Sequence, residues 1–221
     1  MDRYSSISLE ADEYFRRNGR EKERVTQGAR TTVSKLRAIL QRLKHPMVLE
    51  IGCSYGYNLN YIKKEIPNAI CFGIDPSEEA VKYGECIYDS IHLKQGFSQE
   101  LPFEDNSFDV VMLGFCLYTL DRRDLYRTIA EVDRVLKTGG FVAIWDFDTI
   151  NNFSRVNKHN IEIPVYKMNI YNTFGGNPQY YLVEKNSFSH EGDVFHPDVQ
   201  ERCSLYVFYK EDVKNAYLLT D

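Results

Sequence analysis

Two carboxylate residues stand near the ends of apolar runs, where a parallel sheet would present them to a ligand. Glu50 lies in the run VLEIG (48–52), and Asp75 ends the run AICFGID (69–75). A turn of small residues follows Glu50. Asp75 lies 19 residues beyond Gly56, close to the spacing of about 20 residues at which an acid reaches the ribose hydroxyls of a nucleotide. The pattern predicts a nucleotide-like ligand held by a loop and a helix N-terminus.

The turn GCSYG (52–56) permits two other interpretations. A dinucleotide fingerprint would need glycines at 52, 54 and 57, but Ser54 and Tyr57 occupy the last two positions. The same turn matches the GxSxG nucleophile elbow of serine hydrolases, with His190 and His196 downstream. An elbow normally follows several strands, and only helical sequence precedes residue 47. A hydrolase that uses Ser54 as its nucleophile is therefore the last of the alternatives.

The elements that must position these carboxylates alternate along the chain. A helix is predicted over 8–44, interrupted at Gly19 and Gly28 and ended by His45-Pro46. Strands are predicted at 47–52, 69–75, 91–96, 108–113 and 141–147, with helices between them. This alternation favours a parallel sheet covered on both faces. Two later runs, 179–190 and 203–211, predict an antiparallel pair at one edge of that sheet.

The charge of the chain is unevenly distributed. Residues 1–45 hold 11 basic and 6 acidic side chains, whereas the rest holds 16 basic and 26 acidic ones. The acidic body would repel phosphates, which disfavours nucleic acid as a partner. The basic first segment is either a solvated helix face or a surface that attracts an acidic substrate.

Cysteine usage and hydropathy indicate the compartment. The five cysteines are scattered and form no CxxC pair, which favours a reduced, cytoplasmic protein without a zinc site. No apolar run approaches the roughly 20 residues that a membrane span requires, so no membrane association is expected.

Four segments in order resemble the class I S-adenosylmethionine-dependent methyltransferases, in particular their small-molecule branch. They are VLEIGCSYGYNL, CFGIDPSEEAVKYG, QGFSQELPFEDNSFDVVML and EVDRVLKTGGFVAIWDF. The resemblance covers residues 46 to 148. It implies an α/β fold with a Rossmann-like, seven-stranded, mostly parallel sheet flanked by helices, and an antiparallel C-terminal strand. The implied cofactor is S-adenosylmethionine, with S-adenosylhomocysteine as its product.

The resemblance also assigns a cofactor site. Glu50 would hold the methionine amino group and Asp75 the ribose hydroxyls. The remaining cofactor-binding residues would be Gly52, Cys53, Ser54 and Gly56 in the turn, Pro76, Phe97 and Ser98 at the adenine, and Gly114 and Phe115 on the methionine side. Two positions depart from the family pattern. Ser54 replaces a glycine, and Phe97 stands where an aspartate commonly meets the adenine amino group.

Candidates for the catalytic base are poorly marked, because methyl transfer mainly requires alignment of the acceptor. Asp146, Asp148 and His159 are the residues predicted for this role. His190 and His196 are further candidates, and Tyr118 stands where an acceptor pocket is expected. No cluster of Asp and His supports a catalytic metal. The segment DEYFRRN near the N-terminus faintly resembles methyltransferases of surface-sugar biosynthesis.

The resulting hypothesis is an enzyme with two parts. Residues 1–45 are expected to form a helical lid and residues 46–221 the methyltransferase domain, with an acceptor-covering loop at 151–178 and edge strands at 179–211. The acceptor would be a small metabolite, for instance an acidic sugar or nucleotide-sugar hydroxyl. A homodimer is an open option. The main alternative is a non-catalytic S-adenosylmethionine-binding or scaffold protein.

Overall fold

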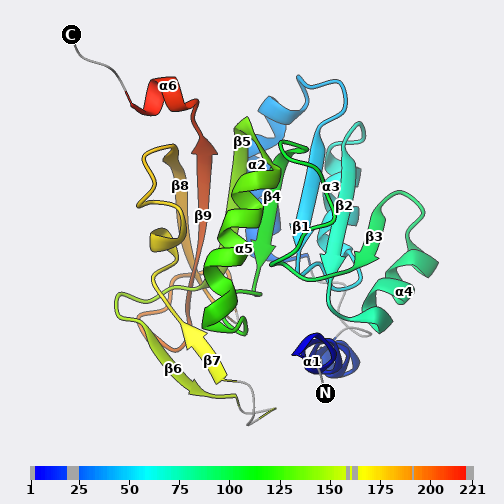
Figure 1. The fold of residues 1–221 in the computed structure, drawn as a ribbon, viewed down its shortest axis with the longest axis vertical. Coiled ribbons are helices and arrows are strands. Elements are labelled where there is room, and N and C mark those ends of the chain that lie inside the picture. Colours follow the sequence, from blue (N-terminus) through cyan, green and yellow to red (C-terminus); the bar gives the residue numbers. More distant parts are fainter. Residues whose placement is uncertain (1–2, 19–24, 158–159, 161–163, 191, 218–221) are drawn as a thin grey trace.

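A seven-stranded sheet forms the centre of the computed structural model, which describes residues 3–18, 25–157, 160, 164–190 and 192–217 (Figure 1). The strand order is β3-β2-β1-β4-β5-β9-β8. The strands are β1 (Met47–Ile51), β2 (Ile70–Asp75), β3 (His92–Gln95), β4 (Phe108–Gly114), β5 (Leu136–Phe147), β8 (Tyr180–Ser189) and β9 (Arg202–Lys210). β1 to β5 are parallel, whereas β9 is antiparallel to both β5 and β8. The predicted fold class is confirmed.

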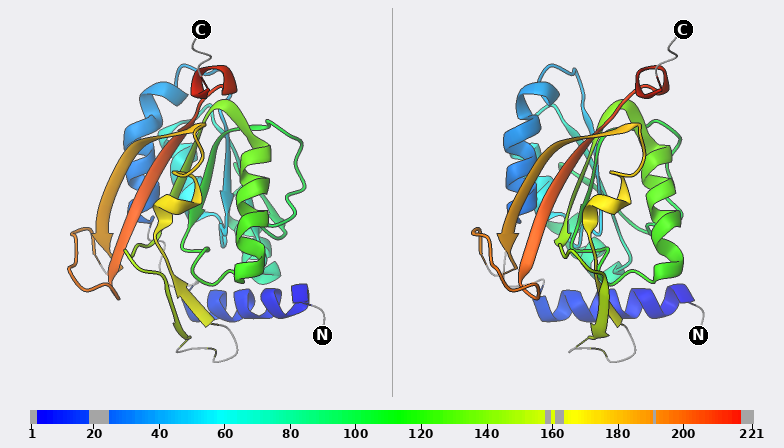
Figure 2. Two further views of the ribbon diagram at one scale, coloured as in Figure 1. Left: turned by 60° about the vertical axis from the view of Figure 1, so that its left-hand side comes forward. Right: turned by 90° about the vertical axis from the view of Figure 1, so that its left-hand side faces the viewer.

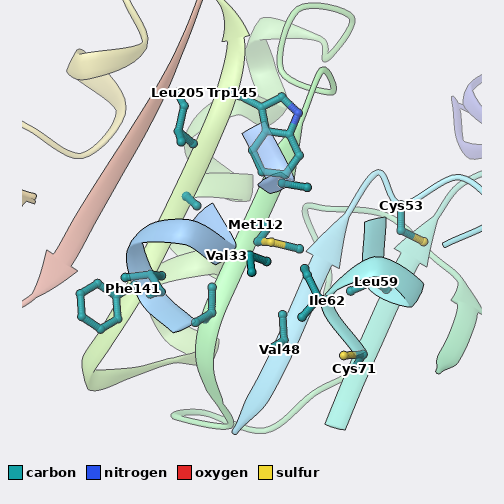
Figure 3. Packing of buried hydrophobic residues seen from close by; sticks show 14 of the residues in the cluster. Val33, Val48, Cys53, Leu59, Ile62, Cys71, Met112, Phe141, Trp145 and Leu205 are labelled. Carbon is teal, nitrogen blue, oxygen red and sulfur yellow. The ribbon is translucent and has the colours of Figure 1, made fainter. Parts of the chain in front are cut away.

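Helices cover both faces of the sheet because its strands are apolar on both sides. One face packs against α2 (Gln27–Leu40), α3 (Tyr57–Glu65) and α4 (Glu78–Ile87), and Figure 3 shows part of this cluster, with Val33 of α2 and Ile62 of α3 near Val48 and Met112. The other face packs against α5 (Arg122–Val135) and the short helix η1 (Ile170–Thr173). The sheet is therefore the middle layer of three.

Two of the helices begin at residues whose side chains cap them. Ser77 accepts a hydrogen bond from the backbone N–H of Ala80 at 2.9 Å, and Asp121 accepts one from Arg123 at 2.9 Å. Both caps satisfy a backbone donor that the first turn of a helix leaves unpaired. These helix starts lie beside the carboxyl ends of β2 and β4, so the caps also fix the loops at that edge of the sheet.

The predicted helix over 8–44 is wrong in its extent. The structure has two helices there, α1 (Arg3–Asn18) and α2, and Gly19 falls outside the described residues. Gly28 does not interrupt a helix but lies inside α2, where it is buried against Trp145 of β5. Because glycine has no side chain, α2 can pack closely against the sheet at this point. A glycine needed for such packing looks the same in the sequence as a glycine that interrupts a helix.

Replacing Gly28 with alanine is expected to lower the free energy of unfolding by about 1–3 kcal/mol, the usual cost of overpacking. A Cβ atom at this position would lie 2.1 Å from Cδ2 of Trp145, whose side chain is completely buried. The strain should exceed the gain of about 1 kcal/mol that alanine brings to a helix interior. Urea denaturation would measure the change. Gly176→Ala is the matched control, since its Cβ meets nothing within 4 Å, and an equal loss in both variants would contradict the prediction.

The segment 151–178, predicted as a loop, contains regular structure. β6 (Phe153–Val156) pairs antiparallel with β7 (Pro164–Lys167), and η1 follows. The prediction of a loop without regular structure is therefore wrong. The asparagines and glycines of this segment lie beside short strands and a short helix, and do not prevent them from forming. The pair of edge strands predicted at 179–190 and 203–211 is confirmed as β8 and β9.

Helix α1 lies across the carboxyl ends of the parallel strands (Figures 1 and 2). Asp12 fastens it to the start of α4, since its Oδ1 accepts hydrogen bonds from Ser77 Oγ at 2.6 Å and from the N–H of Glu79 at 3.1 Å. Phe15 is buried beside Tyr55 and anchors the same helix. The predicted segment 1–45 thus divides, because α2 belongs to the core of the sheet and α1 spans the strand ends. Helix α6 (Val213–Ala216) follows β9.

Candidate functional site

A cavity of about 580 Å³ lies at the carboxyl ends of the parallel strands. Its walls come from the turns after β1, β2, β3 and β4, from α1, and from the segment between β5 and the end of β8. Nine of the predicted site residues line it: Glu50, Gly52, Ser54, Asp75, Pro76, Phe97, Ser98, Gly114 and Phe115. The sequence pattern therefore locates one connected site, at the edge of the sheet where α/β proteins bind ligands.

The turn between β1 and α3 brings backbone close to the cavity. Gly52, Ser54 and Gly56 all have positive φ, at 74°, 50° and 84°. Glycine adopts this conformation without strain, whereas an L-residue rarely does. The N–H of Gly52 donates to the carbonyl of Ile74 at 2.8 Å, which fixes the turn against β2. Ser54, at the family's glycine position, thus keeps the backbone shape that the pattern requires.

Glu50 lies on the floor of the cavity as a buried carboxylate. Its Oε1 accepts a hydrogen bond from Asn58 Nδ2 at 2.7 Å, while Oε2 is buried and accepts no hydrogen bond from any described residue. Burial raises the pKa of Glu50 to about 8, and the bond from Asn58 opposes this only in part. A buried carboxylate oxygen without a donor is costly, so the site favours a ligand that brings a cationic N–H group to Oε2.

Asp75 lies at the end of β2 and is tied to the neighbouring turns. Its Oδ2 accepts from the N–H of Ser54 at 2.7 Å and its Oδ1 from the N–H of Ser77 at 2.8 Å. Burial raises the pKa of Asp75 to about 6, against the effect of these two bonds. Each carboxylate oxygen can accept a further hydrogen bond. The residue is therefore held in place to receive donors, such as two hydroxyls, from the cavity.

The turn after β3 supplies an aromatic surface. Phe97 lines the cavity, and its ring lies 4.5 Å from that of Tyr4 on α1, between centroids. Ser98 shares a hydrogen bond of 2.8 Å with the hydroxyl of Thr128 on α5. Pro76 lines the cavity on the β2 side. The arrangement offers stacking surface to a flat ring rather than a carboxylate acceptor.

Two predicted cofactor-binding residues do not line the cavity. Cys53 is buried in the core, with its sulfur near the Cα side of Gly73 on β2. Gly56 begins α3, and its α-carbon faces Ile91 and Leu93. Both residues therefore support the turn from the side away from the cavity.

The structure does not bring the predicted catalytic aspartates to the cavity. Asp146 is buried in β5 and accepts hydrogen bonds from the N–H groups of Tyr118 at 3.1 Å and Phe147 at 2.7 Å. Burial raises the pKa of Asp146 to about 7. The carboxylate holds the loop after β4 and is enclosed by backbone donors, so the expectation that it faces an acceptor is corrected.

Asp148 is also directed away from the cavity. It accepts a hydrogen bond from the hydroxyl of Tyr206 at 3.0 Å and forms an ion pair with Lys185 at 3.1 Å, both from the edge strands. His159 lies outside the described residues, and His196 does not line the cavity. Among the histidines that the structure describes, only His190 lines the cavity.

Several lining residues were not predicted as site residues. They are Tyr14 and Arg17 on α1, Asn58 on α3, and Asn157 and Tyr166 near the β6–β7 pair. Only Asn58 carries a usable sequence signal, since it is a polar residue in the first turn of a helix whose neighbours Leu59 and Ile62 are core residues. The others come from segments distant in sequence, and no local pattern relates them to Glu50.

The hydrolase interpretation finds no support in the described part of the chain. The backbone N–H of Ser54 donates to Asp75, and no hydrogen bond joins Ser54 to a histidine there. The strand before Ser54 is the first of the sheet in sequence, as the pattern predicts. No cluster of three metal-binding side chains occurs among the described residues, and no helix among them is long and apolar enough to cross a membrane.

Strand order and site together define a class: an α/β protein with a cavity at the carboxyl ends of β1, β2 and β4, the place where this kind of sheet binds nucleotide-like ligands. Residues 49–144 match the family model described as a methyltransferase domain. The resemblance of the four sequence segments to methyltransferases is confirmed over this stretch, which is less than half of the chain.

Curated relatives match the chain over its central half. A demethylmenaquinone methyltransferase of Chlorobaculum tepidum is 34% identical over 106 residues, which are 48% of this chain and 43% of that protein. One from Staphylococcus aureus is 36% identical over 103 residues, 45% of this chain and 42% of that protein. The chain thus matches less than half the length of these relatives.

Solved structures extend the likeness to the whole fold. The methyltransferase in a Haloferax volcanii complex with the Trm112 methyltransferase activator has a TM-score of 0.70 at 19% identity, covering 93% of this chain and 98% of that one. A Burkholderia thailandensis 1,6-didemethyltoxoflavin-N1-methyltransferase, with bound 1,6-didemethyltoxoflavin and S-adenosylhomocysteine, has a TM-score of 0.70 at 15% identity, covering 95% and 89%. At these identities the likeness shows the fold alone.

Proposed function

We propose that this protein transfers a methyl group from S-adenosylmethionine to a small-molecule acceptor. The observation that carries the proposal is the buried Oε2 of Glu50, which accepts no hydrogen bond from the described residues. The α-ammonium group of S-adenosylmethionine is a cationic donor of the kind this oxygen lacks. A charged hydrogen bond there would offset the cost of burying the carboxylate.

The remaining lining residues fit the other parts of the same molecule. Asp75 would accept hydrogen bonds from the two ribose hydroxyls, while its own bonds to backbone N–H groups hold it in position. Phe97 would stack on the adenine in place of the carboxylate that is common in the family, with Pro76 beside it. When bound, S-adenosylmethionine supplies the reactive methyl group, and the protein's part is to align the acceptor and exclude water.

Helix α1 would act as the lid, in a narrower form of the lid expected over 1–45. Tyr14 and Arg17 line the cavity from this helix. The helix is attached at Asp12 and Phe15 and crosses the open end of the cavity, so it would separate bound ligands from bulk water. Residues 46–221 would form the methyltransferase domain, with the β6–β7 pair covering the acceptor through Asn157 and Tyr166.

The acceptor is best described as a small molecule. A sugar or nucleotide-sugar hydroxyl stays a hypothesis from the sequence. An acidic acceptor gains little support from the charges of the cavity, because Arg17 lies 3.6 Å from Glu10 and Arg123 lies 2.7 Å from Asp121. The open cavity favours an enzyme over a scaffold protein, whose pocket would be filled by aromatic side chains. Cytoplasmic location and a homodimer remain predictions.

Isothermal titration calorimetry with S-adenosylhomocysteine tests the proposal directly. We expect binding with a Kd on the order of 1–100 µM, that is, about −8 to −5 kcal/mol. Adenosine, which lacks the amino-acid end, should bind at least about tenfold more weakly, since it leaves Glu50 without a partner. Absence of heat and of any thermal stabilisation by S-adenosylhomocysteine would overturn the proposed function.

A further inference from the structure

Four aromatic side chains form a cluster at one side of the cavity, next to the predicted cofactor site to which Phe115 also belongs. We call Phe115, Tyr118, Phe147 and His190 the aromatic wall. Phe147 is its centre, with ring centroids 5.9 Å from Phe115, 5.4 Å from Tyr118 and 5.0 Å from His190. Phe147 is almost fully buried, whereas the other three line the cavity. The wall thus presents three ring surfaces to whatever lies beside the methyl donor.

The backbone at Phe115 is held in a conformation that a bulky residue rarely adopts. Its φ is +48°, and its N–H donates to the carbonyl of Trp145 at 2.8 Å. Such outliers persist only where the surroundings determine them, and they cluster at functional sites. Here the conformation places the Phe115 ring between the end of β4 and His190. The centroids of the Phe115 and His190 rings are 5.7 Å apart, and the two rings are nearly perpendicular. The strain therefore accompanies a specific placement of an aromatic surface.

The imidazole of His190 is placed by packing as well as by backbone. It stacks on Phe147 with an interplanar angle of 26°, and its backbone N–H donates to the carbonyl of Glu201 at 2.8 Å. The residue is exposed at the end of β8, where it lines the cavity. An imidazole can take a proton near neutral pH, which the enclosed carboxylate of Asp146 is not positioned to do.

We propose that the acceptor is a planar aromatic ring bearing a hydroxyl group, which lies against the aromatic wall and loses its proton to His190. This inference rests on the proposed function. A ring hydroxyl is about as acidic as that of tyrosine, with a pKa near 10, so an imidazole base can assist its ionisation; a sugar hydroxyl is a much weaker acid. A sugar would also need many hydrogen-bond partners, whereas this wall offers mainly ring surface.

The group-transfer step is balanced by the residues present. As the acceptor oxygen bonds to the methyl carbon, the sulfonium carbon–sulfur bond breaks and its electron pair stays on sulfur. The hydroxyl proton passes to the imidazole of His190. The positive charge lost at sulfur thereby appears on the imidazolium, and no further reactant is needed.

Binding of ring compounds to the complex with S-adenosylhomocysteine tests the inference. The probes are 1-naphthol and 8-hydroxyquinoline, with uridine diphosphate glucose as the contrasting ligand, followed by calorimetry or ligand-observed NMR. We expect both ring compounds to bind and Phe115→Leu to weaken them by about tenfold. Phe195→Leu is the matched control, because Phe195 is exposed and lies outside the cavity lining. Binding of the nucleotide sugar but of neither ring compound would overturn the inference.

Variants of His190 separate its role from a structural one. His190→Gln should keep the affinity for 1-naphthol within about threefold but slow methylation, followed by mass spectrometry, by about 10²-fold or more at neutral pH. The rate of the variant should recover as the pH approaches that at which the hydroxyl ionises unaided. An unchanged rate, or an equal effect of Phe195→Leu, would overturn the inference. If the unaltered protein does not bind S-adenosylhomocysteine, the proposed function is overturned, and the inference with it.

Discussion

Replacing Asp75 with alanine is expected to weaken S-adenosylhomocysteine binding by more than about 100-fold, roughly 3 kcal/mol, in isothermal titration calorimetry. The variant loses the carboxylate that would bind the ribose hydroxyls. It also leaves two backbone N–H groups, of Ser54 and Ser77, without their acceptor, so the turn that carries Ser54 is held against β2 only by its remaining backbone hydrogen bonds to Ile74.

Two further variants identify the cause of that loss. Asp75→Asn keeps one acceptor oxygen and the size of the side chain, and should bind with intermediate affinity. Asp105→Ala removes an exposed carboxylate that pairs with Arg134 and should leave the Kd unchanged. Thermal unfolding of each variant checks that the fold is intact. Binding by Asp75→Ala within threefold of the unaltered protein would contradict the assigned role.

Ligand-free protein is expected to lose stability as the pH rises from about 5 to about 8.5, by on the order of 2–4 kcal/mol. The folded protein holds Glu50 with a pKa raised by burial to about 8, well above its unfolded value of about 4.3. The stability linked to this proton is fully present below the unfolded pKa and is lost as the pH rises through about 8. Asp75 and Asp146, with pKa values of about 6 and 7, act with the same sign.

Glu50→Gln should remove the largest part of this pH dependence. Urea midpoints measured at several pH values would show a flatter profile and a more stable ligand-free protein at pH 8, because no charge is then buried without a partner. S-adenosylhomocysteine should bind the variant at least about tenfold more weakly, since the charged hydrogen bond is lost. Glu104→Gln, at an exposed position, is the control. An unchanged slope in Glu50→Gln would contradict the buried charge.

The first five strands and the helices between them could be predicted because each is marked locally. Ser77 and Asp121 cap two of the helices, and the apolar runs form β1, β2, β4 and β5 of a buried sheet. The pair β6–β7 does not follow from the sequence because each strand has only four residues, and β6 is mostly exposed. Gly28 was misjudged because the close contact with Trp145 joins residues that are far apart in sequence.

Only those site residues could be predicted that belong to one local sequence motif. Glu50, Asp75 and the turn between β1 and α3 lie together because adjacent parallel strands end at one edge. The direction of a side chain at such an edge does not follow from the sequence. Asp146 and Asp148 stand at the end of β5 as predicted, but their carboxylates are satisfied by Tyr118, Phe147, Tyr206 and Lys185 away from the cavity. His190 and Tyr166, which we propose for the acceptor side, reach the cavity only through the tertiary fold.

The match to the family model ends at residue 144, before β6, β7, β8 and β9 begin. The carboxylates proposed for the cofactor precede that boundary, whereas Asn157, Tyr166 and His190 follow it. Part of the acceptor side is thus encoded after the stretch that holds these carboxylates, whereas Phe115 and Tyr118 of the aromatic wall lie within that stretch. We expect that exchanging the stretch after β5 between relatives would alter the choice of acceptor while cofactor affinity is inherited unchanged, so that new substrates can arise by recombination rather than by rebuilding the whole site.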